Sequence, residues 1–468
     1  MVQIFKDADI EILGKNVCEV LKNVGIICQN EEILKALEDK GAEVDYLKGT
    51  AKFPEKMVME FVEIFRKEEK DADNLRNFVP PPLPVLSIQV AQFFLDYEKN
   101  EKRRGNKEDF IYLVKLGNSL HKDDGVGHCL LLTEVHPLIE PLEAGSILIE
   151  YAHKPNPPFA WKVEQIDYLI EIGEIFGFKN WFSWGAICFA HPFRFDKDVA
   201  DKFVRRVKEG YPTGLSSMAI AGVTTPVSVE GYVVVAGAEH IATWIAAKSI
   251  NPEVKLIGAM YGGSIDMKTG EVSFSSFDAL FYSFATVEFL KRWCGISIPV
   301  GGGEYCDAKL PGLYAALEKA YKAMIIYAFT GYHPSVGEGM LEEGKTLCAV
   351  QLILERELGT ALRHLGKKIE VDKENIGIDT IFDVGFGIDK TYLESEHTLR
   401  KFRSSLWCPK IWDRSGWNGF EYELKLLKKA QEEVNNLVAE YKKPDIDPDK
   451  ISKIRKVIEK AKKNLLKL

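Results

Sequence analysis

The stretch ISIPVGGGEYCDAKLPGLYAALEKAYKAM, residues 296–324, combines three features in a fixed order. A short apolar run ends in Gly301, Gly302 and Gly303, and a helix-like pattern begins at Gly312. A strand, a glycine-rich turn and a helix form the repeating unit of parallel α/β folds, because parallel strands need a crossover connection. The stretch therefore predicts one such unit, and the fold depends on how often the chain repeats it.

Similar apolar runs recur along the chain, separated by helical patterns. They are VLSIQV (85–90), HCLLLTEV (128–135), SILIEYA (146–152), WFSWGAICF (181–189), TGLSSMAI (213–220), KLIGAMYGG (255–263), ISIPVGGG (296–303) and AMIIYAFTG (323–331). Eight strand-like runs with helices between them predict a (β/α)8 TIM barrel in the α/β class. The first run is weakly marked, and a doubly wound parallel sheet would give a similar pattern.

Flanking segments extend this predicted barrel on both sides. Residues 1–78 predict a helical or mixed N-terminal segment that packs on the barrel, which itself spans residues 79–364. Residues 365–468 predict a C-terminal extension, in which residues 367–414 form a loop-rich segment wrapping over the barrel and charged helices follow. In the last helix, residues 451–468, apolar side chains at helical spacing favour a packing or dimer helix over a basic docking surface.

Composition limits the possible functions. The chain of 468 residues is 46% hydrophobic with a net charge of −8, which argues against nucleic acid as a partner. The cysteines lie at 18, 28, 129, 188, 294, 306, 348 and 408 without a C-x-x-C pair, which suits a reducing cytoplasm. The N-terminus lacks a signal-peptide pattern, and the apolar run YVVVAGAEHIATWIAA contains Glu239 and His240. We therefore expect a cytoplasmic protein without a membrane span, and a buried helix at that run.

The turns after the predicted strands are where a barrel places its working site. GGGEYCDAK lacks the lysine–hydroxyl pair of a phosphate-binding loop, and no G-x-S-x-G nucleophile motif occurs in the chain. Cys129, Cys306, Asp307 and His333 could in principle bind zinc, but no local ligand spacing supports such a site, so no metal is expected.

Aromatic residues gather near the predicted strand ends. They are Trp181, Phe182, Trp184, Phe189, Phe193, Tyr261, Tyr305, Tyr327, Phe329 and Tyr332. Aromatic faces combined with carboxylates bind quaternary ammonium groups through cation–π attraction. Many of these rings are expected in the core, but the interior of such a barrel prefers branched aliphatic residues, which leaves some rings for a pocket.

Several blocks of the sequence resemble the trimethylamine methyltransferase superfamily. They are HPFRFDKD (191–198), SSMAIAGVTTPVSVEGYVVVAGAEHIA (216–242), YGGSIDMKTGEVSFSS (261–276), DAKLPGLYAALEKA (307–320), GMLEEGKTL (339–347) and ESEHTLRKFRSSLWCPKIWDR (394–414). The resemblance implies a (β/α)8 enzyme of anaerobic methylamine metabolism that passes a methyl group from a methylated amine to a corrinoid (cobalamin) protein.

One departure from the family pattern bears on the substrate. The trimethylamine enzymes carry pyrrolysine near the last strand, whereas this chain has only standard residues there, AFTGYHPSVGEGML (328–341). It therefore resembles the non-pyrrolysine branch, which is associated with quaternary amines such as glycine betaine. A quaternary nitrogen already carries its charge and leaves as a neutral tertiary amine. Another methylated donor, or a corrinoid-binding barrel without turnover, remains an alternative.

The resemblance also implies a corrinoid carried by a separate protein, because the D-x-H-x-x-G signature of corrinoid carriers is absent. A homo-oligomer is expected. The candidate catalytic residues are His333, Glu304 and Asp307, with a backbone-bonded loop histidine as the alternative for His333. The candidate substrate-binding residues are Tyr305, Tyr261, Tyr332, Trp184, Arg194 and Lys309, with an Asp307–Lys309 ion pair as the alternative. Gly301, Gly302, Gly303, Gly262, Ser217 and Met218 are the candidate cofactor-facing residues.

Overall fold

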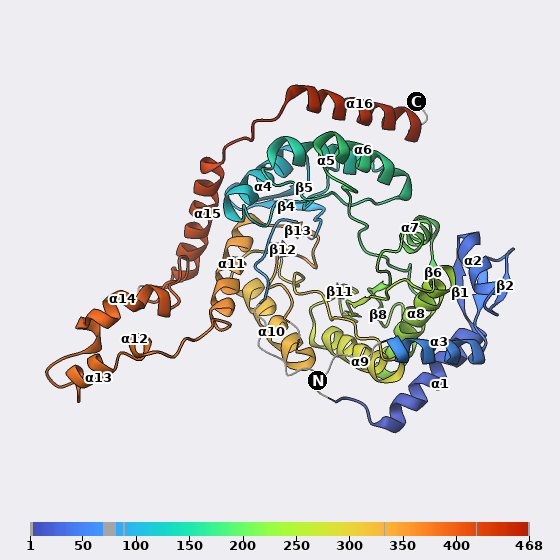
Figure 1. Cartoon of the computed structure of the whole chain (residues 1–468), viewed down its shortest axis with the longest axis horizontal. Coiled ribbons are helices and arrows are strands. Elements are labelled where there is room, and N and C mark those ends of the chain that lie inside the picture. The colour runs from blue at the N-terminus through green and yellow to red at the C-terminus, as the bar shows by residue number, and fades with distance from the viewer. Residues whose placement is uncertain (1–2, 69–80, 88, 332, 418, 467–468) are drawn as a thin grey trace.

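The computed structural model of the protein describes residues 3–68, 81–87, 89–331, 333–417 and 419–466. It is a mixed α/β structure in which long helices alternate with short strands (Figure 1). The described strands belong to four sheets with the orders β2-β3-β1-β6, β11-β10-β8, β12-β13-β4-β5 and β7-β9. None of these four sheets is closed within the described part of the chain.

The elements fall into three groups along the chain. The N-terminal group is α1 (Asp7–Asn23), β1 (Ile26–Cys28), α2 (Glu31–Glu38), β2 (Glu43–Asp45), β3 (Thr50–Lys52) and α3 (Glu55–Glu68). The strands of the central group are β4 (Phe93–Asp96), β5 (Glu101–Arg104), β6 (Arg194–Phe195), β7 (Ser216–Ser217), β8 (Ile220–Ala221), β9 (Ala259–Met260), β10 (Gly263–Ile265), β11 (Val272–Ser273), β12 (Met340–Leu341) and β13 (Thr346–Leu347). Its helices are α4 (Lys107–Leu120), α5 (Glu140–Tyr151), α6 (Ile166–Phe176, after the 3-10 turn Val163–Gln165), α7 (Lys197–Lys208), α8 (Val229–Ile250), α9 (Phe277–Cys294), α10 (Leu313–Thr330) and α11 (Ala349–His364). The C-terminal group is α12 (Lys373–Ile376), α13 (Ile378–Val384), the 3-10 turn Tyr392–Glu394, α14 (Glu396–Ser405), α15 (Tyr422–Glu440) and α16 (Pro448–Leu465).

Parallel backbone pairings link neighbouring central segments in sequence order. Isolated parallel bridges join Ala91 to Leu130, Val126 to Pro155, Phe159 to Ser183, Thr213 to Leu256 and Met260 to Val300. The amide of Ser216 donates to the carbonyl of Ile187 at 2.8 Å, and that of Gly337 donates to Gly303 at 3.1 Å. β13 then pairs in parallel with β4, which returns the series to its first segment.

A helix follows each of these segments. α4 to α11 surround the short strands in Figure 1, and sequence neighbours such as α4 and α5, α8 and α9, and α10 and α11 are in contact. The helical patterns predicted between the apolar runs are confirmed, for example at α4, α6, α7, α8 and α9. The order of the units is that of a (β/α)8 fold, whereas a continuous closed barrel stays a prediction.

Two of the predicted strands are wrong. Residues 146–152 and 323–331 belong to α5 and α10 instead. α5 is buried along most of its length, so it lacks the polar face that marks an amphipathic helix, and a short apolar run does not distinguish a buried helix from a strand. The third segment with parallel bridges instead lies between Pro155 and Phe159, and the eighth follows Gly337.

The N-terminal group packs against α8 and α9. β1 pairs in parallel with β6 and antiparallel with β3, so this segment extends a central strand rather than forming a separate unit. α1 lies so close to α9 that a Cβ on Gly14 would come within 2.2 Å of Nε1 of Trp293. The predicted boundary between residues 78 and 79 lies outside the described residues.

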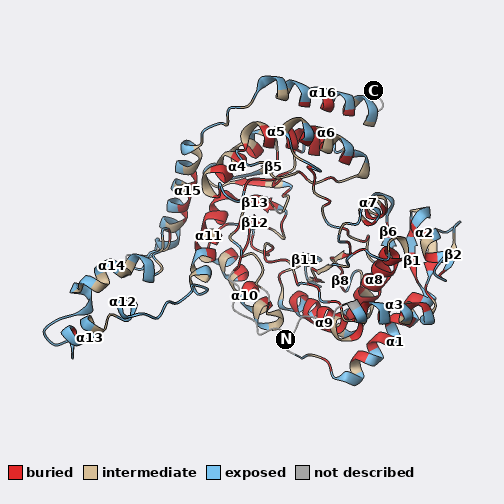
Figure 2. Cartoon of the chain, in the orientation of Figure 1, coloured by how far each residue is buried: buried red, intermediate tan, exposed pale blue. Residues whose placement is uncertain are grey.

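The C-terminal group differs from the expectation. α15 contacts α11 and α4, and α16 contacts α5 and α6, so these two helices form an outer layer on the central group. The segment between α11 and α15 does not wrap over the central group as predicted. It projects away from it in Figure 1, and Figure 2 shows it mainly as exposed.

α8 is the helix expected from the apolar run that contains Glu239 and His240. Among the described helices it alone is long and apolar enough to cross a membrane, and 78% of its most apolar window is buried within the protein. Both Glu239 and His240 are fully buried. α8 is therefore a core helix, as the sequence predicted.

Candidate active site

The glycine run at 301–303 forms a close-packed turn after the seventh parallel segment. A Cβ on Gly301 would come within 2.2 Å of the Tyr261 ring, and one on Gly303 would come within 2.2 Å of the carbonyl oxygen of Ser335. Gly302 has a φ of +85°, a conformation that glycine adopts without steric cost. The run therefore allows the Tyr261 ring and the 334–335 backbone to lie directly on the turn.

Three aromatic rings meet beside this turn. The centroid of Tyr305 lies 6.2 Å from that of Tyr261 and 5.9 Å from that of Phe274. Gln89 donates from Nε2 to the Tyr305 hydroxyl at 3.4 Å. Tyr305 is 6% exposed and Tyr261 is half-buried, so Tyr261 is the more accessible of the two rings, here called the Tyr261–Tyr305 wall. The structure thus brings the candidate residues Tyr261 and Tyr305 next to each other, and their role in binding substrate stays a prediction.

The segment that follows the turn is bonded to the β12–β13 hairpin. The amide of Glu342 donates to the carbonyl of Ala308 at 3.0 Å, and that of Glu343 donates to Cys306 at 2.8 Å. Glu342 and Glu343 have φ values of +49° and +56°, which are uncommon for residues with a side chain. This strained turn brings Glu343 beside the glycine turn.

Several acidic side chains are thereby brought together. Glu338 is 3% exposed, and its Oε2 atom has no hydrogen-bond partner within the described structure. Burial, followed by the charges of Glu304 and Glu355, raises the pKa of Glu338 well above its ordinary value. Burial also raises the pKa of Glu304, against the opposing charges of Lys322 and Lys319.

Glu343 is a further acid in the same cluster, a half-buried residue whose two carboxyl oxygens are shielded from solvent. Burial raises its pKa to about 8, in opposition to the charge of Lys322 and with a contribution from neighbouring Asp307. Asp307 itself is half-buried and accepts a hydrogen bond from the Ser273 hydroxyl at 2.7 Å. The structure places Asp307 next to Glu343 and Ser273 and gives no ion pair between Asp307 and Lys309, which is exposed.

Two fully buried lysines on α10 neutralise part of this charge. Lys319 forms an ion pair with Glu355 of α11, whose Oε1 also accepts from Gln351 Nε2 at 2.9 Å. The pKa of Lys319 is raised, because the adjacent Glu355 outweighs the effect of burial. Lys322 donates to the carbonyl of Tyr305 at 2.9 Å and to Ser275 Oγ at 3.1 Å.

The cluster contains more carboxyl groups than ammonium groups. Lys319 is paired with Glu355, which leaves Lys322 as the cation that acts most strongly on Glu304 and Glu343. Carboxyl groups held together in a buried site share protons, since several charges of one sign are costly there. An entering cation would be stabilised by ionisation of these acids and by the faces of the two tyrosines.

Other predicted residues are not brought into this cluster. Trp184 is 8% exposed and packs edge-on against Phe182 and Tyr211. Arg194 is exposed, donates to the carbonyl of Ala190 at 3.0 Å and lies opposite Ile27 in the sheet with the N-terminal group. The ring of His333 stacks on Tyr327 at 4.6 Å, and burial lowers its pKa. Tyr332 lies outside the described residues.

The remaining candidates have packing partners. The amide of Gly262 donates to Ser283 of α9 at 2.8 Å, and a Cβ at this position would come within 2.5 Å of that hydroxyl. Ser217 is buried, and the amide of Met218 donates to His191 Nε2 at 3.1 Å. Packing and hydrogen bonding within the protein therefore account for Gly262, Ser217 and Met218 without a cofactor, and the proposed contact of these residues with a cofactor stays a prediction.

Two buried histidine–glutamate pairs brace the ends of the parallel segments. His191 Nδ1 lies 2.8 Å from Glu239 Oε2, and His128 Nε2 lies 2.9 Å from Glu140 Oε1. Trp161 donates to the other oxygen of Glu140 at 3.0 Å. Glu140 and Trp161 also line a cavity of about 530 Å³ with the apolar side chains of Val90, Leu131, Leu132, Val135 and Pro137. The cavity opens beside the ends of the first three segments.

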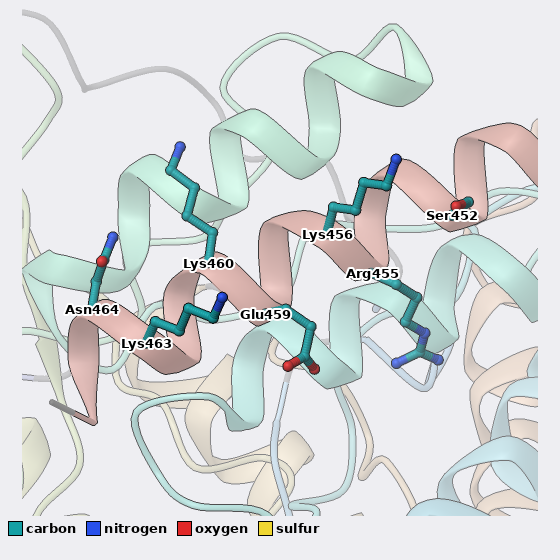
Figure 3. Close-up of a pocket in the computed structure, with 7 residues that line it drawn as sticks. All are labelled: Ser452, Arg455, Lys456, Glu459, Lys460, Lys463 and Asn464. Atoms are coloured by element: carbon teal, nitrogen blue, oxygen red, sulfur yellow. The ribbon is translucent and has the colours of Figure 1, made fainter. Parts of the chain in front are cut away.

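Another hollow lies on the outer face of α16, far along the chain from the glycine turn. Figure 3 shows that it is lined by polar and charged side chains from this helix, among them Lys456, Lys460 and Lys463. Arg455 is paired with Glu143 at 2.8 Å, and Lys460 is paired with Glu171 at 3.0 Å. The apolar residues Ile454, Val457 and Ile458 are buried underneath. α16 is therefore a packing helix with a solvated basic face, which was the favoured interpretation of its sequence.

Sequence reasoning missed five members of the acidic cluster: Glu338, Glu343, Glu355, Lys319 and Lys322. Their shared signal is charge inside a predominantly apolar pattern, as in AALEKAYKAMII, where the two lysines are three residues apart and lie on one helix face. Both lysines lie in the helical pattern predicted from Gly312, but the pattern does not show that they face carboxyl groups. Among the described residues, no group of three or more His, Cys, Asp or Glu side chains is arranged to hold a metal ion.

Comparison with known proteins identifies the family. The family profile described as Trimethylamine methyltransferase (MTTB) matches residues 1–465. The chain belongs to this family. The resemblance seen in the sequence is thus confirmed, and with it the expectation of a methyltransferase of this family.

Relatives in this family differ in how much of the chain they match. A glycine betaine methyltransferase from Desulfitobacterium hafniense is 22% identical over 97% of this chain and 96% of its own length. A trimethylamine methyltransferase from the same species is 21% identical over 98% of this chain and 93% of its own. Trimethylamine methyltransferase MttB2 from Methanosarcina mazei is 26% identical, but the match covers 59% of this chain and only 55% of that relative. The solved hydroxylamine complex of MtmB matches with a TM-score of 0.40 at 10% identity, over 92% of this chain and 93% of its own, and carries no argument at this level.

Proposed function

We infer that this family member transfers a methyl group from a quaternary amine of the glycine betaine type to the corrinoid of a separate partner protein. The observation that carries this proposal is the excess of carboxyl groups over ammonium groups next to the Tyr261–Tyr305 wall. A permanently charged, methylated nitrogen is the ligand chemistry that such a site favours. The relative named glycine betaine methyltransferase, which matches nearly the full chain, supports the same substrate class.

The eight units in order, with β13 returning to β4, support a (β/α)8 barrel as the scaffold for this activity. In such a barrel the glycine turn at 301–303 and the hairpin turn at 342–345 stand at the carboxyl ends of neighbouring strands, where active sites lie. Tyr261, Glu304 and Asp307 are half-buried, so the proposed substrate can reach them from solvent. No membrane is needed for this chemistry, and we place the protein in the cytoplasm.

The residues of this chain hold and polarise the substrate. The tyrosine faces and the acids stabilise the positive nitrogen, and they position one methyl group toward the open side of the site. When bound, a reduced corrinoid on the partner protein would supply the electron pair that forms the new bond to the methyl carbon. The carbon–nitrogen bond breaks with its electrons moving to nitrogen, so the product is a neutral tertiary amine and needs no proton from the protein. Holding the reactants in line is the main contribution required, and this can supply up to about 7–11 kcal/mol.

The test is a donor screen with chemically reduced cobalamin under anaerobic conditions, followed by the absorbance of methylcobalamin. Glycine betaine, proline betaine and carnitine are compared with trimethylamine and dimethylamine. We expect product from at least one quaternary amine and little from the tertiary and secondary amines. Turnover with trimethylamine alone would contradict the substrate class. Cobalamin binding without product from any donor would contradict the activity.

A further inference from the structure

The segment from Leu365 to Lys410, here called the arm, leaves the protein after α11 and returns at α15. Within it, α12, α14 and the 3-10 turn Tyr392–Glu394 bury no residue, and α13 buries only Val384. Figure 2 shows the arm as a projection with a mainly exposed surface. The arm therefore has no hydrophobic core of its own.

The composition of the arm is not that of a solvated loop. Phe386 is 99% exposed, Ile388 85%, Leu393 84% and Phe382 74%. Two exposed phenylalanine rings alone offer on the order of 300–500 Å² of apolar surface. An exposed apolar patch of a few hundred Å² on a soluble protein marks an interaction site.

The arm nevertheless has defined local structure. Asp372 caps α12 through the amide of Asn375, and Ser395 caps α14 through the amide of Thr398. Lys401 of α14 forms an ion pair with Glu374 of α12 at 2.9 Å. Polar contacts in water contribute little to ordering a chain, so burial against another surface must supply most of the stabilisation.

A second exposed apolar surface, here called the α10 face, lies on the same chain. On α10, Leu313 is 69% exposed, Tyr314 60%, Leu317 58% and Met324 57%. These positions repeat at helical spacing and form one stripe. The amide of Leu313 bonds to Glu423 at 2.7 Å, next to α15, so the α10 face lies beside the point where the arm rejoins the protein.

We propose that the arm of one copy of this chain packs on the α10 face of a second copy, in a reciprocal two-fold dimer. Within one chain the two surfaces remain separately exposed, whereas a second copy covers both at once. The base of the arm lies beside the α10 face of the same chain. A two-fold axis close to this point would place the arm of each copy on the α10 face of the other, which is the reciprocal contact that an isologous interface requires.

Charge and composition favour a second copy over other partners. Within the arm, residues 365–410, the number of lysine and arginine residues equals the number of aspartate and glutamate residues, so the arm offers no net charge to an acidic protein or an anionic membrane. Permanent interfaces are more apolar than transient ones, so the apolar arm suits a permanent partner such as a second copy. A protein that delivers a corrinoid at each turnover needs a transient interface instead. This inference is independent of the substrate proposed above.

The first experiment is sedimentation velocity of the full chain over a concentration series. We expect a species of twice the chain mass of 52.8 kDa. The arm variant Phe382→Glu/Phe386→Glu and the α10 variant Leu313→Glu/Leu317→Glu should each weaken dimerisation by about 100-fold or more, as loss of interface anchors does. Leu47→Glu, at a fully exposed apolar residue of the N-terminal group, is the matched control and should remain dimeric. Far-UV circular dichroism checks that each variant is folded.

A mixing experiment tests which surface meets which. A heterodimer of the arm variant and the α10 variant keeps one intact arm-on-α10 contact, so mixing the two monomeric variants should restore part of the dimer. A monomeric wild type would overturn the proposal. A dimer that is lost with the arm variant but not with the α10 variant would overturn the arm-on-α10 pairing.

Discussion

The charge of Glu304 raises the pKa of Glu338, a carboxyl group whose pKa burial already holds well above its ordinary value. When a quaternary cation binds beside such a pair, the ionised forms become more stable and a proton is released. Binding of the cation should therefore strengthen as pH rises toward the raised pKa values. We expect the KM for the methylated amine to fall with increasing pH, as measured by initial rates of methylcobalamin formation.

Glu338→Gln should flatten this pH dependence and raise KM while leaving the fold intact, because glutamine has the volume of the protonated acid. Glu253→Gln, at an exposed position outside the cluster, provides the control and should keep the wild-type profile. A Glu338→Gln enzyme with an unchanged KM–pH curve would mean that this acid does not respond to the substrate.

Glu343 makes stability depend on pH in a defined direction. Its folded-state pKa of about 8 exceeds its ordinary value of 4.5, so between these values the folded state binds more protons than the unfolded state. Its contribution to stability is present below about pH 4.5 and is lost as pH rises toward 8. Glu343→Gln should therefore stabilise the protein at pH 8 and change it little at pH 5. Urea unfolding at both pH values, compared with Glu253→Gln, measures this difference.

The ion pair of Lys319 and Glu355 is fully buried and links α10 to α11. Lys319→Met leaves the Glu355 carboxylate without its cation and should cost about 3–5 kcal/mol in the free energy of unfolding. Lys319→Met/Glu355→Gln should recover much of that loss, because no charge is then left uncompensated. A double-mutant cycle in urea measures the coupling, and additive losses would contradict it.

The helices and their order could be predicted from the sequence, but two strands could not. The amphipathic patterns of α4, α6 and α7 indicate which face of each helix is buried. α5 is buried on almost all sides, so its sequence is a continuous apolar run that a buried strand would also give. In α10 the run AMIIYAFT continues a helix that begins at Leu313, and its apolar composition resembles that of a strand. Hydrophobic periodicity can identify a helix only when one face of the helix is polar and exposed, so it does not identify a helix that is buried on all sides.

For the site, the sequence identified the turn but not its partners. Tyr261, Tyr305, Glu304 and Asp307 follow predicted strands, and proximity to the strand ends was sufficient to select them. Glu338 and Glu343 depend on the conformation of the β12–β13 hairpin, including two residues at positive φ, which composition does not indicate. Trp184 and Arg194 were selected by the same proximity, but the direction of a side chain at a strand end is set by tertiary packing.

Tyr305 should contribute through its ring face rather than its hydroxyl. Cation–π attraction is worth about 0.5–2 kcal/mol, so Tyr305→Leu should raise the KM for a quaternary amine by about 2- to 30-fold. Tyr305→Phe keeps the ring and loses only the contact with Gln89, so its KM should stay near that of the wild type. Equal effects of the two changes in the donor assay would argue against a cation at this ring.

Gly301 provides a test of the turn itself. A methyl group there would overlap the Tyr261 ring, at 2.2 Å from Cε1, so Gly301→Ala should displace that ring. We expect methyl transfer to fall by at least about tenfold, since small misplacements at a reacting centre carry large rate penalties. Gly416→Ala is the matched control, because a Cβ there meets no atom within 4 Å. If Gly301→Ala retained wild-type activity, the Tyr261 ring would not be part of the site.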